Sequence, residues 1–161
     1  MVPMPPFLVS VLSLLLLVVS QRPADVVRWS ATGPDKPVTA GSEAKVTLNA
    51  KIESGWRLYA LTQPVGGPVK LAIATPKGTA FTIAAKRIVA PEPKVHTDEN
   101  FKLDTQFYDT DTVFTVPVSV PKTMAAGKQQ VPIEVTFQAC GDTICLRPFT
   151  ERLTVNITVT R

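Results

Sequence analysis

Residues 151–160, Glu-Arg-Leu-Thr-Val-Asn-Ile-Thr-Val-Thr, give the clearest indication of how this chain folds. From Leu153 to Val159 every second residue is leucine, valine or isoleucine, and threonine or asparagine lies between them. Successive side chains of a β-strand point to opposite faces of a sheet, so the pattern predicts a strand with one buried and one solvated face.

The same period of two recurs upstream, whereas few windows show the 3.6-residue period of a helix. β-branched residues fill these runs, and turn signals such as Gly33-Pro34-Asp35 and Pro76-Lys77-Gly78 separate them. About eight short strands at this spacing predict an all-β, immunoglobulin-like sandwich. The predicted strands are residues 26–31, 44–52, 56–61, 69–74, 81–89, 112–120, 131–140 and 151–160.

The stretch from Pro91 to Asp111 is longer and more polar than a tight turn requires. Long loops are uncommon in compact domains, and many of them act as functional lids. We therefore expect a long loop here that covers part of the molecule.

The two cysteines lie close together, in Cys140-Gly-Asp-Thr-Ile-Cys145. Gly141-Asp142 is a turn dipeptide, so a hairpin can bring the two sulfurs into bonding distance. The chain-entropy estimate gives such a six-residue loop roughly 2 kcal/mol of stabilisation, against about 4 kcal/mol for a bridge across about 60 residues. The bond is therefore either a minor structural clip or a site of thiol exchange.

The sequence around the cysteines resembles a known active-site hairpin. Residues 135–140 (Val-Thr-Phe-Gln-Ala-Cys) and 145–148 (Cys-Leu-Arg-Pro) are similar to the hairpin of the N-terminal domain of the thiol:disulfide interchange protein DsbD. Residues 55–59 and 114–118 resemble two strands of that family in the same order, so the resemblance covers nearly all of residues 25–160. It implies an exported module for thiol-disulfide interchange.

The resemblance also implies roles for individual residues. Cys145 would form mixed disulfides with partner proteins, and Cys140 would resolve them. Residues 98–101, Asp-Glu-Asn-Phe, resemble the family's cap segment, in which the ring of Phe101 would cover the disulfide while Asp98 and Glu99 flank it.

Other interpretations stay open at these positions. Phe107 is the alternative cap residue, and the alternative role for Phe101 is that of a core residue beneath a long loop. Tyr59 would stand beside the site by the same resemblance, or it packs within the sandwich. We expect Trp56 in the core and His96, the single histidine, on the surface rather than bound to a metal.

Thiol exchange requires a thiolate, an accessible sulfur and a partner disulfide, so we expect no metal and no organic cofactor. The pair lies between predicted strands and lacks a helix N-terminus to stabilise a thiolate, so strong intrinsic activation is not expected. Asp142 would oppose ionisation of the thiols and Arg147 would favour it.

The sequence departs from the family pattern in two places. Arg147 stands where the family often has a proline, and the sequence ends at Arg161, where DsbD continues into electron-transporting domains. We therefore expect electrons from a thioredoxin-like or membrane DsbD-type donor on a separate chain, and oxidised periplasmic thiol proteins as acceptors. The alternative function is a non-catalytic sandwich that binds a protein partner and uses the disulfide as a clip.

The first residues predict export. Phe7–Val19 is almost wholly apolar but short of the roughly 20 residues that a membrane-spanning helix needs. We expect a signal peptide at residues 1–20, cleaved after Ser20, and one periplasmic domain at residues 21–161 without stable membrane insertion. An uncleaved anchor is the alternative.

The net charge of +4 gives no support to nucleic-acid binding, because the basic residues are scattered and their longest run is Lys86-Arg87.

Overall fold

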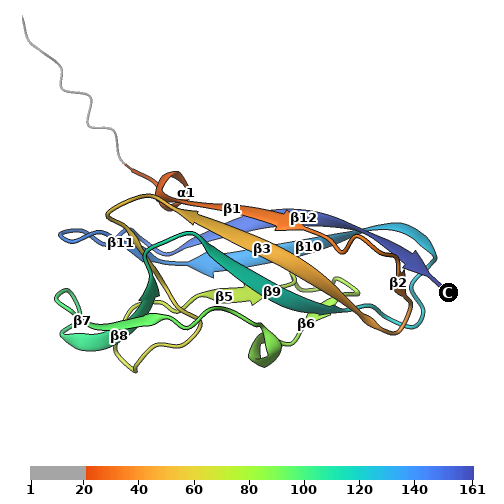
Figure 1. The fold of residues 1–161 in the computed structure, drawn as a ribbon. Helices are drawn as coiled ribbons and strands as arrows, with labels where there is room; N and C mark the ends of the chain where they lie inside the picture. Colours follow the sequence, from red (N-terminus) through yellow and green to blue (C-terminus); the bar gives the residue numbers. More distant parts are fainter. Residues whose placement is uncertain (1–20) are drawn as a thin grey trace, which may run out of the picture.

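The computed structural model describes residues 21–161 (Figure 1). The predicted signal peptide, residues 1–20, lies outside the described residues.

Two four-stranded sheets form the sandwich (Figure 1). The strands of the first sheet, in spatial order, are β1 (Val27–Thr32), β3 (Glu43–Ile52), β9 (Thr112–Ser119) and β6 (Thr82–Ile83). Those of the second are β2 (Val38–Thr39), β12 (Phe149–Thr160), β10 (Gly127–Phe137) and β5 (Ala72–Ala74). Neighbouring strands are antiparallel except for the short parallel pair of β2 and β12.

A third, smaller sheet carries the cysteine hairpin. Its strands, in spatial order, are β11 (Ala139–Cys140), β4 (Arg57–Tyr59), β8 (Leu103–Tyr108) and β7 (Lys94–Asp98). Figure 1 places β7, β8 and β11 at one end of the molecule, and β2 with the C-terminus at the opposite end. Two short helical segments, α1 (Pro23–Val26) and η1 (Ala85–Arg87), complete the elements.

The core lies between the two larger sheets, where alternate residues of the longer strands are buried. In β12 the pattern that predicted a half-buried strand is confirmed, since Val155, Ile157 and Val159 are buried and the residues between them are exposed. β10 contributes every second residue from Val131 to Phe137 in the same way. The predicted all-β, immunoglobulin-like sandwich is therefore confirmed.

The expectation of a long loop without strands at residues 91–111 was wrong. The stretch predicted as a long loop, residues 91–111, contains the antiparallel hairpin of β7 and β8. The backbone N–H groups of Phe101 and Lys102 donate to the carbonyl of Asp98 at 3.2 and 2.7 Å, and Lys102 closes the turn with a φ of 55°. The cap segment, residues 98–101, is thus the tip of a hairpin.

Several predicted strands also have different limits. Residues 56–61 and 69–74 contain only the shorter strands β4 and β5. Residues 81–89 contain only the two-residue β6, followed by η1. The strand predicted at residues 131–140 begins earlier, at Gly127, and is interrupted at Gln138, where the chain leaves one sheet for another.

Candidate functional site

The two cysteines form the predicted disulfide on the late hairpin. Cys140 ends β11, and the turn that follows is closed by a hydrogen bond from the N–H of Gly141 to the carbonyl of Ile144 at 2.8 Å. The N–H of Leu146 donates to the carbonyl of Ala139 at 2.9 Å. Backbone hydrogen bonds therefore join the two arms of the hairpin on both sides of the disulfide.

The two sulfur-bearing residues differ in their exposure. Cys140 is fully buried, at 0% exposure, whereas Cys145 is only partly buried. Ile144, next to Cys145, is 56% exposed. A partner that approaches from solvent therefore reaches Cys145 before Cys140.

Aromatic side chains pack around the disulfide. Tyr59 of β4, Phe107 of β8 and Cys140 form a buried cluster, and Phe101 and Cys145 pack against it. The Phe101 ring meets Tyr59 edge to face, with 6.0 Å between ring centroids. Phe107 is buried within β8, whereas Phe101 is partly exposed at the tip of the β7–β8 hairpin. Both candidate cap residues thus lie at the site, and Phe101 is the one on its solvent side.

Tyr59 links the cap segment to the disulfide. Its hydroxyl donates to Oδ2 of Asp98 at 2.7 Å and lies 4.0 Å from Sγ of Cys145. Burial, followed by this hydrogen bond, raises the pKa of Tyr59 far above its ordinary value. The phenol therefore keeps its proton and acts as a donor.

Asp98 is buried, yet it remains ionised near neutral pH. Burial on its own would raise the pKa of its carboxyl group, but hydrogen bonds from Tyr59 and from the backbone N–H of Asn100 outweigh burial and lower it. Glu99 is exposed next to it and pairs with Lys102 at 2.5 Å, which lowers the pKa of Glu99. Of the two acidic residues predicted to flank the disulfide, Asp98 has the hydrogen bond to Tyr59.

The sequence analysis did not identify Arg57. This residue lies opposite Cys140 in the ladder between β4 and β11, and its guanidinium pairs with Asp142 in the hairpin turn at 2.6 Å. The guanidinium also lies over the Phe107 ring, 5.4 Å from its centroid. A signal was present in the sequence, because Arg57 and Tyr59 are two residues apart on one strand and share a face.

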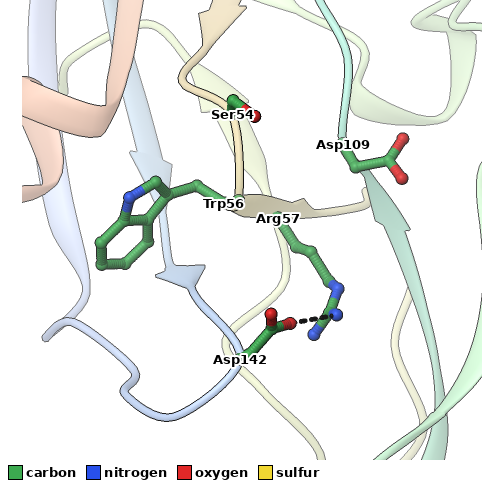
Figure 2. A pocket seen from close by; sticks show the side chains of 6 residues that line it. Ser54, Trp56, Arg57, Asp109 and Asp142 are labelled. Carbon is green, nitrogen blue, oxygen red and sulfur yellow. Dashed lines mark hydrogen bonds and ion pairs between the residues drawn. The ribbon is translucent and has the colours of Figure 1, made fainter.

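A polar pocket of about 340 Å³ adjoins this ion pair (Figure 2). In Figure 2 the Arg57 side chain extends toward Asp142, and the ring of Trp56 extends away from both. Trp56 packs against the main core, where we expected it. The lining residues are Ser54, Gly55, Trp56, Arg57, Asp109 and Asp142.

His96 is exposed on β7. Across residues 21–161, no three His, Cys, Asp or Glu side chains gather in a way that could hold a metal ion. Over the same residues, none of the helices has the length and apolar character needed to cross a membrane.

A comparison with protein-family models relates this chain to a known family. The family described as "Thiol:disulfide interchange protein DsbD, N-terminal" matches residues 30–157. The reduced N-terminal domain of DsbD from Neisseria meningitidis has a TM-score of 0.52 and 16% identity, with 74% of this chain and 82% of that chain covered. This likeness shows a shared fold.

The N-terminal periplasmic domain of ScsB from Proteus mirabilis has a TM-score of 0.49 and 19% identity, with 82% of this chain covered. The chain spans 45% of that structure. No curated protein sequence matches the chain.

Proposed function

Because the chain belongs to the family of the N-terminal domain of DsbD, a thiol:disulfide interchange module, we propose that it passes reducing equivalents between a thioredoxin-like donor and oxidised extracytoplasmic proteins. Cys140 and Cys145 are the catalytic residues of this proposal. The observation that carries it is the disulfide itself, which offers a partly exposed Cys145 and a fully buried Cys140.

Reduction of the domain takes two exchange steps. A donor thiolate attacks Sγ of Cys145, the bond between the two cysteines breaks, and Cys140 leaves as a thiolate that takes up a proton. The second thiolate of the donor then attacks the donor sulfur of the mixed disulfide. The donor leaves with its own disulfide, and Cys145 becomes the second thiol of the domain.

Delivery to a substrate reverses these roles. The Cys145 thiolate attacks a substrate disulfide and forms a mixed disulfide, while one substrate sulfur leaves as a thiolate. Cys140 then attacks Cys145, which releases the second substrate thiolate and restores the bond of the domain. The burial of Cys140 suits this resolving role, because only a sulfur already beside it can react with it.

The residues around the bond control access to it in this proposal. Phe101 covers the solvent side of the cluster and moves with the hairpin tip when a partner docks. Tyr59 and Asp98 fix that tip by their hydrogen bond, and the carboxylate of Asp98 places negative charge near Cys145. Such a charge disfavours a free thiolate, so exchange would depend on docking rather than on intrinsic reactivity.

The proposed reaction moves two electrons and two protons between sulfur atoms, and it needs no metal and no organic cofactor. We place it in the periplasm, where disulfides persist. The proposed donor is a thioredoxin-like protein or a membrane DsbD-type protein.

Trapping of mixed disulfides tests the proposal. A Cys140→Ser variant lacks the resolving thiol, so exposure to an oxidised periplasmic extract should leave partner proteins attached to Cys145. These would be detected as reductant-sensitive bands and identified by mass spectrometry. The matched Cys145→Ser variant keeps only the buried thiol and should trap little. Equal trapping by both variants, or by neither, would support the alternative of a structural clip.

A further inference from the structure

Gln138 lies at the point where the chain changes sheets. The residue before it, Phe137, ends β10 and pairs with Phe149 of β12. The residue after it, Ala139, begins β11 and pairs with Leu58 of β4. Such a crossing interrupts the regular ladders and leaves nearby backbone groups without their usual partners, which must be satisfied in another way.

The side chain of Gln138 supplies two of these partners. Its Oε1 accepts a hydrogen bond from the backbone N–H of Val69 at 2.9 Å, and its Nε2 donates to the carbonyl of Leu146 at 3.2 Å. Val69 lies in the segment before β5, and Leu146 directly follows Cys145. One amide group therefore ties the arm that carries Cys145 to a separate segment of the domain.

The hairpin is also held by contacts other than its sulfurs. Leu146 is hydrogen-bonded to Ala139, and the ion pair of Arg57 with Asp142 joins the turn to β4. None of these contacts needs the disulfide. These contacts can therefore hold the two arms of the hairpin together after the sulfur–sulfur bond breaks.

We propose that Gln138 is a positioning residue that holds the Cys145 arm against Cys140 in the dithiol state, and so favours re-formation of the disulfide. This inference rests on the proposed exchange function. It concerns the equilibrium between dithiol and disulfide, not the identity of the protein partners.

The equilibrium can be written with glutathione as the partner. The dithiol gives two electrons and two protons to one glutathione disulfide, which becomes two glutathione thiols, while Cys140 and Cys145 form their bond. The equilibrium constant has units of concentration and measures how well the protein pre-positions its two thiols. A loosened arm must be ordered again when the bond forms, so it lowers this constant.

The test is a Gln138→Leu variant equilibrated with mixtures of reduced and oxidised glutathione. The fraction of disulfide, measured after acid quench and thiol labelling, should give an equilibrium constant roughly fivefold lower than that of the wild type, the change expected from the net contribution of one hydrogen bond.

Gln63 provides the matched control. Its amide also makes two backbone hydrogen bonds, donating to the carbonyl of Gln106 and accepting from its N–H, and both of these groups belong to β8 rather than to the hairpin. Gln63→Leu should lower the stability of the fold but leave the glutathione equilibrium unchanged.

An unchanged constant in Gln138→Leu, or an equal drop in both variants, would overturn the inference. If Gln138→Leu does not fold, Gln138→Glu replaces it, because a carboxylate still accepts from Val69 but cannot donate to Leu146. Failure of the proposed function would show differently, as the loss of protein mixed disulfides with a normal response to glutathione.

Discussion

At the scale of single residues, Tyr59 is the side chain through which the parts of the site meet. It packs with Phe107 and Cys140, meets the ring of Phe101, and holds Asp98 at the hairpin tip. Its register in β4, opposite Phe107, fixes this position by backbone pairing rather than by the loop. A change at the tip is therefore expected to affect access to the sulfurs before it affects the fold.

Replacement of Phe101 by alanine tests the covering role of that ring. We expect reaction with glutathione to accelerate roughly two- to tenfold, the equivalent of a lost sulfur–aromatic contact of about 0.3–1.5 kcal/mol. Exchange with a thioredoxin-like donor should change much less, because docking displaces the tip in any case. Stopped-flow rates for both reactants measure the difference.

Val95→Ala is the control for Phe101→Ala, since Val95 is an exposed residue of the same hairpin. It should alter neither rate. Equal acceleration of both reactions in Phe101→Ala, or no acceleration at all, would mean that Phe101 only packs.

Tyr59→Phe removes the hydroxyl that hydrogen-bonds to the buried carboxylate of Asp98. The free energy of unfolding at pH 7 should fall by about 1.5–3 kcal/mol, the usual range for a hydrogen bond to a charged group. The folded-state pKa of Asp98 is lowered, so the stabilisation is present above its unfolded value of about 3.9 and is lost as the pH falls through the folded value. Urea unfolding from pH 7 downward should show the two proteins converging below about pH 4.

Tyr108→Phe is the comparison for Tyr59→Phe. The hydroxyl of Tyr108 donates to the neutral carbonyl of Pro91 at 3.0 Å. The effect of its loss on the free energy of unfolding should therefore not change with pH between 7 and about 4. A difference between wild type and Tyr59→Phe that stayed constant with pH would argue against an ionised Asp98 as the partner.

At the scale of elements, the sequence predicted the strands whose two faces differ. β3, β9, β10 and β12 each alternate buried residues with half-buried or exposed ones over much of their length, and all four were anticipated. β7 was missed because four of its five residues are exposed, so its sequence shows no apolar period. It is a strand because β8 offers a ladder to pair with, which local sequence does not report.

The candidate site, like the strands, could be predicted only where local sequence carries the signal. The disulfide could be predicted from its spacing and turn residues, and the family resemblance directed attention to Tyr59, Asp98 and Phe101. Arg57 and Gln138 act through partners far away in sequence, Asp142 and Val69. Contacts of this kind depend on which strands become neighbours, and the sequence pattern did not specify the third sheet.

At the scale of the whole molecule, the sandwich core rather than the disulfide maintains the fold. The closed loop is short, so reduction should lower the free energy of unfolding by only about 2 kcal/mol or less. Denaturant midpoints with and without reductant measure this change. A variant with serine at both cysteines should show no response to reductant, and unfolding of the wild type on reduction would contradict the prediction.

The pairing of Phe137 with Phe149 has a consequence for how such a domain can change over evolution or by design. These two residues close the long β10–β12 ladder, so residues 138–148 leave and re-enter this ladder at two points whose separation is fixed. An insertion, a deletion or a replacement within this segment therefore shifts no strand register in the β10–β12 ladder. The segment that contains the disulfide can in this sense be exchanged as a unit, while the β10–β12 ladder on either side of it keeps its pairing.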